Sequence, residues 1–299
     1  MNELTLRLAE ERDLAALAAL IAGQNRNPET QCIHSETGES ERAVYEEMST
    51  LHGNGELCFV LAHDGDRLVG ALGSELDEEM GRGWLRGPFV LADGQAWETT
   101  AAALLDELAA RLSPSIRRLD SFLNAANERG NAFYQARGFS RVTLVHVYSA
   151  PAPAGAAGPP VPGVLALEAG APLAPSFAAL HDATFPETWI TGQGILARLG
   201  GDYHAFVHAR DGQVVGYLVA SLELGSGEGI VDFIGVSPEA RRQGIGRGLL
   251  QAALGWFFQE TGVARVNLVV SDDKVDARAL YESVGFARRY TGVHTRKDW

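Results

Sequence analysis

The chain has 299 residues, about twice the length of an ordinary single domain. Its 46% hydrophobic content can form a buried core and excludes a disordered chain, while a formal net charge of −13 argues against a general nucleic-acid-binding protein. Two cysteines, Cys32 and Cys58, are too few for a disulfide framework, and no apolar run reaches the length of a membrane span. We therefore expect a soluble, cytoplasmic protein of two domains that binds neither nucleic acid nor membrane.

The first half predicts a domain of mixed strands and helices. The alternating segment 5–9 indicates a strand, and the apolar segment 14–22 behind three charged residues indicates a helix. The Asp-Gly pair at 64–65 lies between β-rich segments and predicts a hairpin turn. A helical pattern follows at 98–112, and a further strand is expected at 142–148.

Residues 150–163 hold five of the twelve prolines and no charged residue, which is typical of a stiff, extended linker. The chain on either side of it repeats. Segments 127–139 and 274–286 share an aromatic residue, a tyrosine and a Gly-Phe pair, with Tyr134 and Tyr281 147 positions apart. Segments that begin at Phe59 and Phe206 repeat at the same offset. We infer a duplication with domains at 1–149 and 164–299.

The second half predicts another mixed domain. A hairpin turn is expected at 211–213, strands at 230–236 and 266–270, and a long helix at 246–261. The fold class expected for both halves is α/β with a mixed sheet.

A glycine-rich turn joins the strand 230–236 to the long helix. Gly244, Gly246 and Gly248 lack side chains, so backbone N–H groups at the helix start can approach an anion closely. Three arginines lie in the same stretch, and residues 241–299 carry a net charge of +4 against −10 for residues 1–150. The pattern favours a pyrophosphate site, the alternative being a glycine-rich turn beside a solvated arginine face.

Two motifs of the second half resemble the acetyl-CoA motifs of the GNAT superfamily of N-acetyltransferases. They are Arg241-x-x-Gly244-x-Gly246 after a Val-x-Pro turn, and then Ala277, Leu280-Tyr281-Glu282 and Gly285-Phe286. The similarity covers the second half, and the first more weakly, which implies two tandem GNAT-type acyl-CoA N-acyltransferase domains. The implied cosubstrate is acetyl-CoA; the eight histidines show no ligand spacing, so no metal is expected.

The resemblance implies that the strands ending at Val236 and Val270 diverge and that the pantetheine arm lies between them. Lys274 stands where the family has an asparagine and is expected to reach a CoA phosphate. The residues implied to bind the cosubstrate are Ile234, Val236, Arg241, Arg242, Gln243, Gly244, Ile245, Gly246, Arg247 and Lys274.

The resemblance also implies that Tyr281 is the general acid that protonates the leaving thiolate, the alternative being a core tyrosine of an amphipathic helix. The family's usual positions for a general base hold Ile230 and Val269. By strand periodicity Asp232 and Glu228 lie on the same face as Ile230, so we expect Asp232 to be the base, with Glu228 as second choice.

The first half departs from this pattern. Aligning Val90 with Val236 places Gln95, Glu98 and Thr100 opposite Arg241, Gly244 and Gly246. A glutamate at a pyrophosphate site is electrostatically unfavourable, so we expect a degenerate domain that does not bind CoA productively, although Tyr134 is retained.

The expected function is transfer of an acetyl group from acetyl-CoA to a primary amine of a small molecule or peptide, by direct attack in the second domain. The alternatives are a CoA-binding sensor or scaffold without turnover, and a protein N-terminal acetyltransferase. Phe185, Pro186 and Trp189 are expected in the wall of the acceptor site, or alternatively in the core.

Overall fold

The computed structural model describes residues 4–35, 40–152, 162–186, 188–201, 203–222 and 227–298, with Val142 described by its backbone alone. Two compact units divide these residues. The first extends to Val145 and includes the C-terminal residues from Tyr290 onward; the second extends from His146 to Arg289. No helix in the described part of the chain is both long and apolar enough to cross a membrane.

The first unit contains a mixed sheet in the order β1-β2-β3-β4-β5-β12. Neighbouring strands are antiparallel except β4 and β5, which are parallel. The elements are β1 (Leu4–Leu8), α1 (Leu14–Asn25), a 3-10 turn (Ile33–Ser35), α2 (Glu41–Gly53), β2 (Leu57–Asp64), β3 (Arg67–Asp77), β4 (Arg82–Val90), α3 (Gly94–Arg111), β5 (Arg118–Asn124), α4 (Glu128–Ala136), β6 (Ser140–Pro151) and, from the chain's end, β12 (Ala287–Asp298).

The second unit repeats this plan with the strand order β6-β11-β10-β9-β8-β7. Here β10 and β11 form the parallel pair. The elements are β7 (Val164–Ala166), α5 (Ala174–Thr184), α6 (Gly192–Arg198), β8 (Tyr203–Arg210), β9 (Gln213–Leu222), β10 (Gly229–Val236), a 3-10 turn (Pro238–Ala240), α7 (Ile245–Trp256) with a π-helical end (Phe257–Thr261), β11 (Arg265–Ser271) and α8 (Val275–Glu282).

Most elements that the sequence predicts are confirmed. The predicted strands correspond to β1, β6, β10 and β11, and the predicted helices to α1, α3 and α7. Both hairpin turns also form, between β2 and β3 and between β8 and β9. Of the linker expected at 150–163, residues 153–161 lie outside the described part of the chain.

Two strands contribute residues to both units. β6 passes from the first unit to the second at Val145, and β12 passes from the second to the first at Tyr290. Within the first unit β12 pairs with β5, from Gly292 opposite Asn124 to Asp298 opposite Arg118. The expected boundaries at 149 and 164 follow the sequence repeat, whereas the compact units place the last residues of the chain with the first unit.

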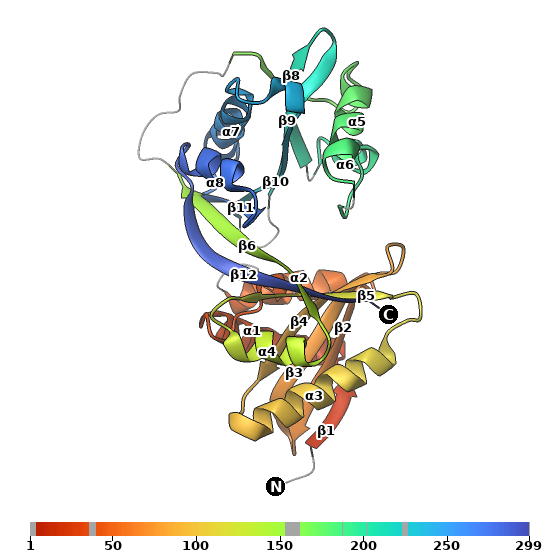
Figure 1. The fold of residues 1–299 in the computed structure, drawn as a ribbon. Helices are drawn as coiled ribbons and strands as arrows, with labels where there is room; N and C mark the ends of the chain where they lie inside the picture. The colour runs from red at the N-terminus through yellow and green to blue at the C-terminus, as the bar shows by residue number, and fades with distance from the viewer. Residues whose placement is uncertain are drawn as a thin grey trace. The chain divides into compact units, whose positions relative to one another are not determined.

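Helices cover both faces of each sheet, as Figure 1 shows for α5 and α6 against α7 and α8 in the second unit. In that unit, Val231, Leu268 and Tyr281 belong to the core beneath α7 and α8. Phe177, Tyr217 and Phe233 belong to a separate core beneath α5 and α6. The two cores define two faces, called below the α7/α8 face and the α5/α6 face.

A buried carboxylate anchors β12 in the first unit. Asp120 on β5 is fully buried and accepts hydrogen bonds from Arg82 (2.6 Å), His294 (2.6 Å) and Arg296 (2.9 Å), the last two on β12. Burial alone would raise the pKa of Asp120, but the bonds from His294 and Arg296 and the charge of Arg82 hold it well below its usual range. The carboxylate therefore stabilises the fold at neutral pH, and this contribution is lost in strong acid.

We predict that Asp120→Asn lowers the free energy of unfolding by about 3 kcal/mol or more, because it leaves buried cationic groups without their counter-charge. The matched control is Asp298→Asn, whose carboxylate pairs with Arg118 at 2.7 Å on the same two strands but is 59% exposed. That change should cost under about 1 kcal/mol. Urea denaturation of the full chain measures both, and equal losses would contradict the anchoring role of Asp120.

Candidate active site

The parallel strands β10 and β11 separate part-way along their length. Their pairing covers Gly229 to Val231 on β10 and Val266 to Leu268 on β11, and no described residue pair continues it. The divergence of two strands near Val236 and Val270, which the sequence analysis expected, begins at this point. We call the resulting gap the β10–β11 opening.

The backbone of β10 directs polar groups toward this opening. Ser237 donates its N–H to Val215 of β9, and Gly235 lies opposite Tyr217 in the same antiparallel register. Because alternate residues of a strand direct their N–H and C=O groups to opposite sides, Ile234 and Val236 direct theirs to the opening. These are the two strand residues from which the sequence analysis expected hydrogen bonds to a pantetheine arm.

The turn that follows β10 leads into α7, and no side chain of the described residues caps the N-terminus of this helix. Gly244 is the N-cap of α7 with a left-handed φ of 81°. A Cβ at Gly244 would meet nothing within 4 Å, so space remains in front of the first N–H groups of α7. A helix start with free N–H groups attracts an anion such as a pyrophosphate.

Side-chain contacts hold this turn in place. Arg241 donates from Nε to the carbonyl of Val236 at 3.0 Å. Gln243 donates to the carbonyl of Glu239 at 3.1 Å and accepts from Arg210 at 2.6 Å. These bonds fix Gln243 and the Arg241 guanidinium close to the chain at the start of α7.

Arg242 also belongs to the turn and adopts a left-handed φ of 61°. Its guanidinium pairs with Asp276 of α8 at 2.8 Å, and both side chains are 82% exposed. Screening by solvent makes this pair weak, so Arg242 is available to a phosphate.

The remaining candidate cofactor residues lie at the starts of α7 and α8. Ile245 is buried, and a Cβ at Gly246 would come within 3.0 Å of Leu280 on α8, so the glycine permits the two helices to approach closely. Arg247 is exposed and donates to the carbonyl of Ser283 at 3.4 Å. Lys274, at the N-cap of α8, pairs with Asp273 at 2.7 Å.

Tyr281 lies on α8 in the core of the α7/α8 face, with its ring beside Tyr148 and Phe286. Burial raises its pKa to about 12, so the phenol keeps its proton at any ordinary pH. No described group forms a hydrogen bond with its hydroxyl, and the hydroxyl oxygen is not fully buried. The oxygen is therefore accessible to solvent although the ring is buried.

Asp232 is the extra residue of a β-bulge. Val231 lies opposite Ala220 and Phe233 opposite Val219, so the register leaves Asp232 without a partner on β9. Its carboxyl accepts a hydrogen bond from Ser221, while Oδ2 is buried and has no partner. Burial raises the pKa of Asp232 to about 7 against the opposing effect of Ser221, and a carboxyl with such a pKa can exchange a proton at neutral pH.

Glu228, the second candidate base, is bound to β11. It pairs with Arg265 at 3.2 Å and accepts a short hydrogen bond from the side-chain amide of Asn267. Asn267 in turn accepts from Ser149 of β6. These contacts give Glu228 a structural part in joining three strands, and the geometry favours Asp232 as the base.

The bulge also decides which face the carboxyl reaches. Val231 packs on the α7/α8 face and Phe233 on the α5/α6 face, so the bulge reverses the alternation of side chains. Ser221, the partner of Asp232, follows Ala220 of the α7/α8 core and therefore lies on the α5/α6 face. Tyr281 therefore packs on the α7/α8 face of the sheet and Asp232 lies on the α5/α6 face.

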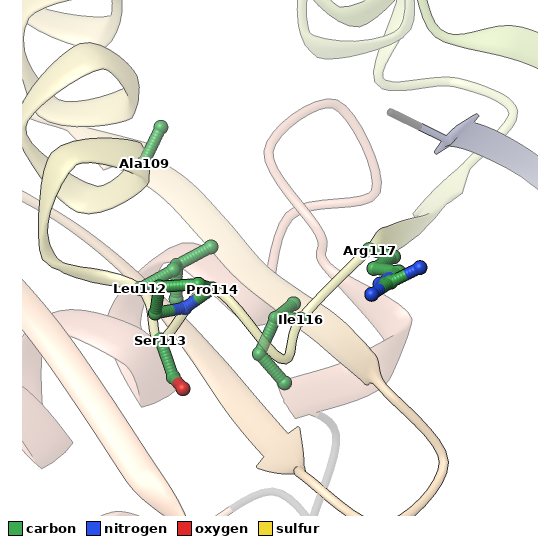
Figure 2. A pocket seen from close by; sticks show the side chains of 6 residues that line it. All are labelled: Ala109, Leu112, Ser113, Pro114, Ile116 and Arg117. Atoms are coloured by element: carbon green, nitrogen blue, oxygen red, sulfur yellow. The ribbon is translucent and has the colours of Figure 1, made fainter.

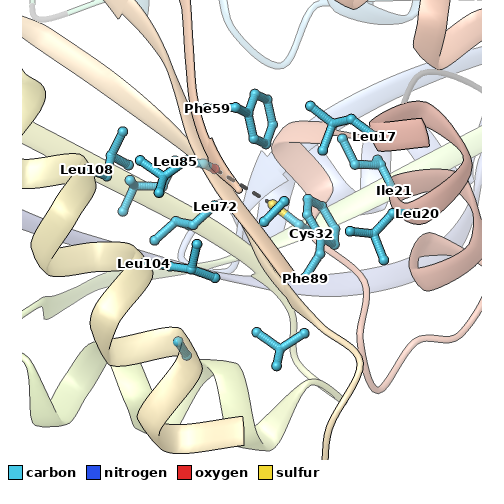
Figure 3. Packing of buried hydrophobic residues seen from close by; sticks show 14 of the residues in the cluster. Leu17, Leu20, Ile21, Cys32, Phe59, Leu72, Leu85, Phe89, Leu104 and Leu108 are labelled. Atoms are coloured by element: carbon cyan, nitrogen blue, oxygen red, sulfur yellow. Dashed lines mark hydrogen bonds between the residues drawn. The ribbon is translucent and has the colours of Figure 1, made fainter. Parts of the chain in front are cut away.

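The first unit has the corresponding opening, but its own chain fills it. β4 and β5 stop pairing after Leu85 opposite Ser121. Beyond this point Cys32 bridges to Leu123 of β5, and its sulfur accepts the N–H of Gly87 of β4 at 3.2 Å. Figure 3 shows Cys32 among the core side chains, with its bond to the Leu85 carbonyl.

Further contacts fix this inserted segment, which we call the plug (Gln31–Ser35). Gln31 accepts two hydrogen bonds from Asn124, one from the backbone N–H at 3.2 Å and one from the side-chain amide at 2.7 Å. His34 Nδ1 lies 3.1 Å from the carbonyl oxygen of Leu85. No described bridge of this kind joins β10 or β11 in the second unit.

The start of α3 differs as well. β4 ends at Val90 and α3 begins at Gly94, so Gln95, Glu98 and Thr100 lie inside the helix rather than in a phosphate-binding turn. Tyr134 is fully buried, and its hydroxyl donates to the carbonyl of Gly87 at 2.9 Å. Unlike Tyr281, it has no accessible hydroxyl.

A shallow hollow at the end of α3 contains no residue of acid–base chemistry (Figure 2). It is lined by Ala109, Leu112, Ser113, Pro114, Ile116 and Arg117. Across the described ranges, no three His, Cys, Asp or Glu side chains come together in a way that could hold a metal ion.

Comparison with known families agrees with this geometry. The model of the acetyltransferase (GNAT) family matches residues 174–286, from the start of α5 to the residue before β12. This range contains the β10–β11 opening, the uncapped helix and Tyr281. Residues 174–286 form a GNAT domain.

Curated relatives point to the same family. A mycothiol acetyltransferase of Salinispora tropica is 33% identical over 144 residues, which are 44% of this chain and 47% of that protein. A mycothiol acetyltransferase of Kocuria rhizophila is 39% identical over 88 residues, 28% of this chain and 29% of that protein. The matches thus span less than half the length of these relatives.

Solved structures match the tandem GNAT fold over almost the whole chain. A GCN5-related N-acetyltransferase of Sphaerobacter thermophilus has a TM-score of 0.75 at 20% identity, covering 99% of this chain and 95% of that one. A tandem GNAT protein from the clavulanic acid biosynthesis pathway has a TM-score of 0.67 at 16% identity, covering 99% and 98%. The first unit is thus a second copy of the GNAT fold.

The sequence analysis missed Ser221, the bulge and the plug. Asp232 did carry a signal, because it is a lone carboxylate in an otherwise apolar strand. A bulge depends on the register against β9 and has no local sequence pattern, and the same is true of a segment inserted between two distant strands.

Asp232 makes a testable contribution to stability. Because its pKa is about 7 in the folded chain and near 3.8 unfolded, its burial becomes increasingly unfavourable as pH rises from about 4 to 7. We predict that Asp232→Asn stabilises the protein increasingly from pH 5 to pH 7, by roughly 2 kcal/mol over that interval, and by a constant amount above it. Urea denaturation at several pH values measures this.

The matched control is Asp276→Asn, since Asp276 is an exposed aspartate of the same unit. Its effect on the free energy of unfolding should be small, because the carboxylate is exposed to solvent. A pH-independent effect of Asp232→Asn would show that the carboxyl has an ordinary pKa.

Proposed function

We propose that the second unit transfers an acetyl group from acetyl-CoA to a primary amine of a small molecule or peptide. The observation that carries this proposal is the β10–β11 opening, which lies between the carboxyl of Asp232 and the glycine-rich start of α7 in the chain. The family match supports the acetyl donor, because acetyl-CoA is the donor of GNAT enzymes. The family match also supports an acceptor that carries an amine.

The chain offers a fitting set of groups for each part of acetyl-CoA. The uncapped start of α7, with Arg241, Arg242 and Arg247 around it, suits the pyrophosphate. The backbone groups of Ile234 and the N–H of Val236, which face the opening, suit the amides of the pantetheine arm. The cosubstrate supplies the activated acyl group, and the residues of the chain position it and move protons.

Asp232 acts as general base. The amine nitrogen forms a bond to the carbonyl carbon and gives up a proton, directly or through water, to the carboxylate of Asp232. A backbone N–H of β10 that faces the opening donates to the carbonyl oxygen as negative charge develops there.

Tyr281 acts as general acid. As the bond between carbon and sulfur breaks, the thiolate takes the phenolic proton, so the products are an N-acetylated amine and free CoA. The high pKa of Tyr281 keeps its proton in place until the thiolate forms.

We predict that Asp232→Asn lowers kcat at least about 100-fold and leaves acetyl-CoA affinity within about twofold of wild type. In the wild type, kcat/KM should rise with pH through about 7, because only the ionised carboxylate accepts a proton. Thiol release with a panel of primary amines measures both, and calorimetry measures acetyl-CoA affinity.

The matched control is Glu228→Gln, which alters a carboxylate of the same strand region that is engaged by Arg265 and Asn267. Any loss of activity in this variant should accompany a loss of stability. Full activity of Asp232→Asn would exclude Asp232 as the base. Acetyl-CoA binding without release of thiol with any amine would favour a sensor or scaffold.

We further propose that the first unit does not bind CoA. The plug occupies its opening, and the turn that would hold a pyrophosphate is reduced to the three residues between β4 and α3. The residue directly after the last β4–β5 pair is Arg86, at the place that Asp232 takes after the last β10–β11 pair. Arg86 is buried and pairs with Glu47 and Glu75, so this strand position holds a cation in place of a carboxylate.

We predict that each chain binds one molecule of CoA. Arg241→Ala combined with Arg247→Ala should weaken binding at least about tenfold, because two cationic donors to the pyrophosphate are lost. Isothermal titration calorimetry measures the stoichiometry and affinity. The control is Arg129→Ala together with Arg137→Ala, which removes two arginines of α4 and its end in the first unit. Two equivalent CoA sites per chain would contradict the proposal.

A further inference from the structure

Large apolar side chains are exposed on the α5/α6 face of the second unit around Asp232. Trp189, in the segment between α5 and α6, is 42% exposed. Val269 of β11 is 56% exposed and directly follows Leu268, the last residue paired with β10. Both side chains thus present apolar surface on the face that carries the carboxyl of Asp232.

Aromatic rings of the core pack against the indole of Trp189. Trp189 lies 5.7 Å from the ring of Phe233, the chain neighbour of Asp232, and 6.5 Å from the ring of Tyr203. Phe185 also contacts Phe233, at 5.3 Å. Because Phe233 and Tyr203 are buried, the indole rests on the core and presents its remaining surface outward.

A buried histidine fixes the segment that carries the indole. His181 Nε2 lies 3.0 Å from the carbonyl oxygen of Ile190, which can only accept, so Nε2 is the protonated nitrogen. Nδ1 then accepts the hydroxyl proton of Tyr217 at 2.9 Å. This bonding ties the residue after Trp189 to α5 and β9, so the indole is held in place before any ligand arrives.

Several polar side chains on this face bond within the chain. Glu228 accepts from Arg265 and from Asn267, and Ser221 donates to the carboxyl of Asp232. An acceptor with many hydroxyl groups would bury them against Trp189 and Val269 without hydrogen bonds, which is unfavourable. An acceptor with an apolar body meets no such penalty.

We propose that the acceptor is a primary amine on a flat apolar body, such as an arylalkylamine. Its ring lies between Trp189 and Val269 while its nitrogen reaches the carboxyl of Asp232. This inference rests on the proposed function of the second unit, and it makes Trp189 a residue that determines acceptor specificity.

The test compares 2-phenylethylamine and tryptamine with glucosamine and ethanolamine as acceptors for the full chain. We expect kcat/KM to be at least tenfold higher for the two arylalkylamines. Trp189→Ala should raise KM for 2-phenylethylamine about tenfold and leave KM for acetyl-CoA unchanged, because a ring contact is lost. Trp189→Phe should restore most of the affinity.

The matched control is Leu165→Ala, which truncates an exposed apolar residue on β7 of the same unit. It should leave both KM values unchanged. Higher kcat/KM for glucosamine, or an arylalkylamine KM that Trp189→Ala does not change, would overturn the inference while leaving the acetyltransferase proposal intact.

Binding separates the two proposals if no amine is acetylated. Calorimetric titration of 2-phenylethylamine into wild type, Trp189→Phe and Trp189→Ala reports binding without turnover. Binding that Trp189→Ala abolishes would support the inference even though the proposed activity had failed. Absence of binding to wild type would overturn it.

Discussion

The second unit depends on the point where β10 and β11 stop pairing. Parallel pairing ends at Val231 and Leu268, and the next residue of β10, Asp232, forms a bulge against β9. The separation directs the backbone groups of Ile234 and the N–H of Val236 into the opening, and the bulge turns the strand so that Phe233 joins the opposite core. One irregularity therefore creates the opening, its polar edge and the position of the carboxyl. Buried Tyr281, on the other face, completes the set of groups.

The first unit shows what happens when the same opening is filled. Its plug makes contacts that a bound ligand would otherwise make. The sulfur of Cys32 accepts the N–H of Gly87, and the backbone of Cys32 bridges to Leu123. Tyr134 bonds a carbonyl instead of reaching solvent, and Arg86 takes the place of an acid. The duplicated fold thus retains its packing while the chemical site remains in one copy. The charges follow the same division, since the acidic residues concentrate in the first half.

The sequence predicted those features that are local in the chain. The glycine-rich turn, the strand before it, the helix after it and the tyrosine near the end each have a short pattern, and the structure forms these elements where expected. The position of β12 in the first sheet could not be predicted, because it depends on Asp120 binding His294 and Arg296 far along the chain. The sequence alignment placed Glu98 in a pyrophosphate-binding turn, whereas Glu98 lies inside α3, which begins at Gly94. The short turn between β4 and α3 has no sequence pattern that would predict it.

The central claim is that one opening, in the second unit, brings acetyl-CoA between Asp232 and Tyr281. A crystal structure of the chain with CoA and an amine measures this directly. The account predicts a single CoA with its pyrophosphate at the start of α7, its pantetheine arm between β10 and β11, and its sulfur near the Tyr281 hydroxyl. CoA bound in the first unit, or bound outside the β10–β11 opening, would contradict it.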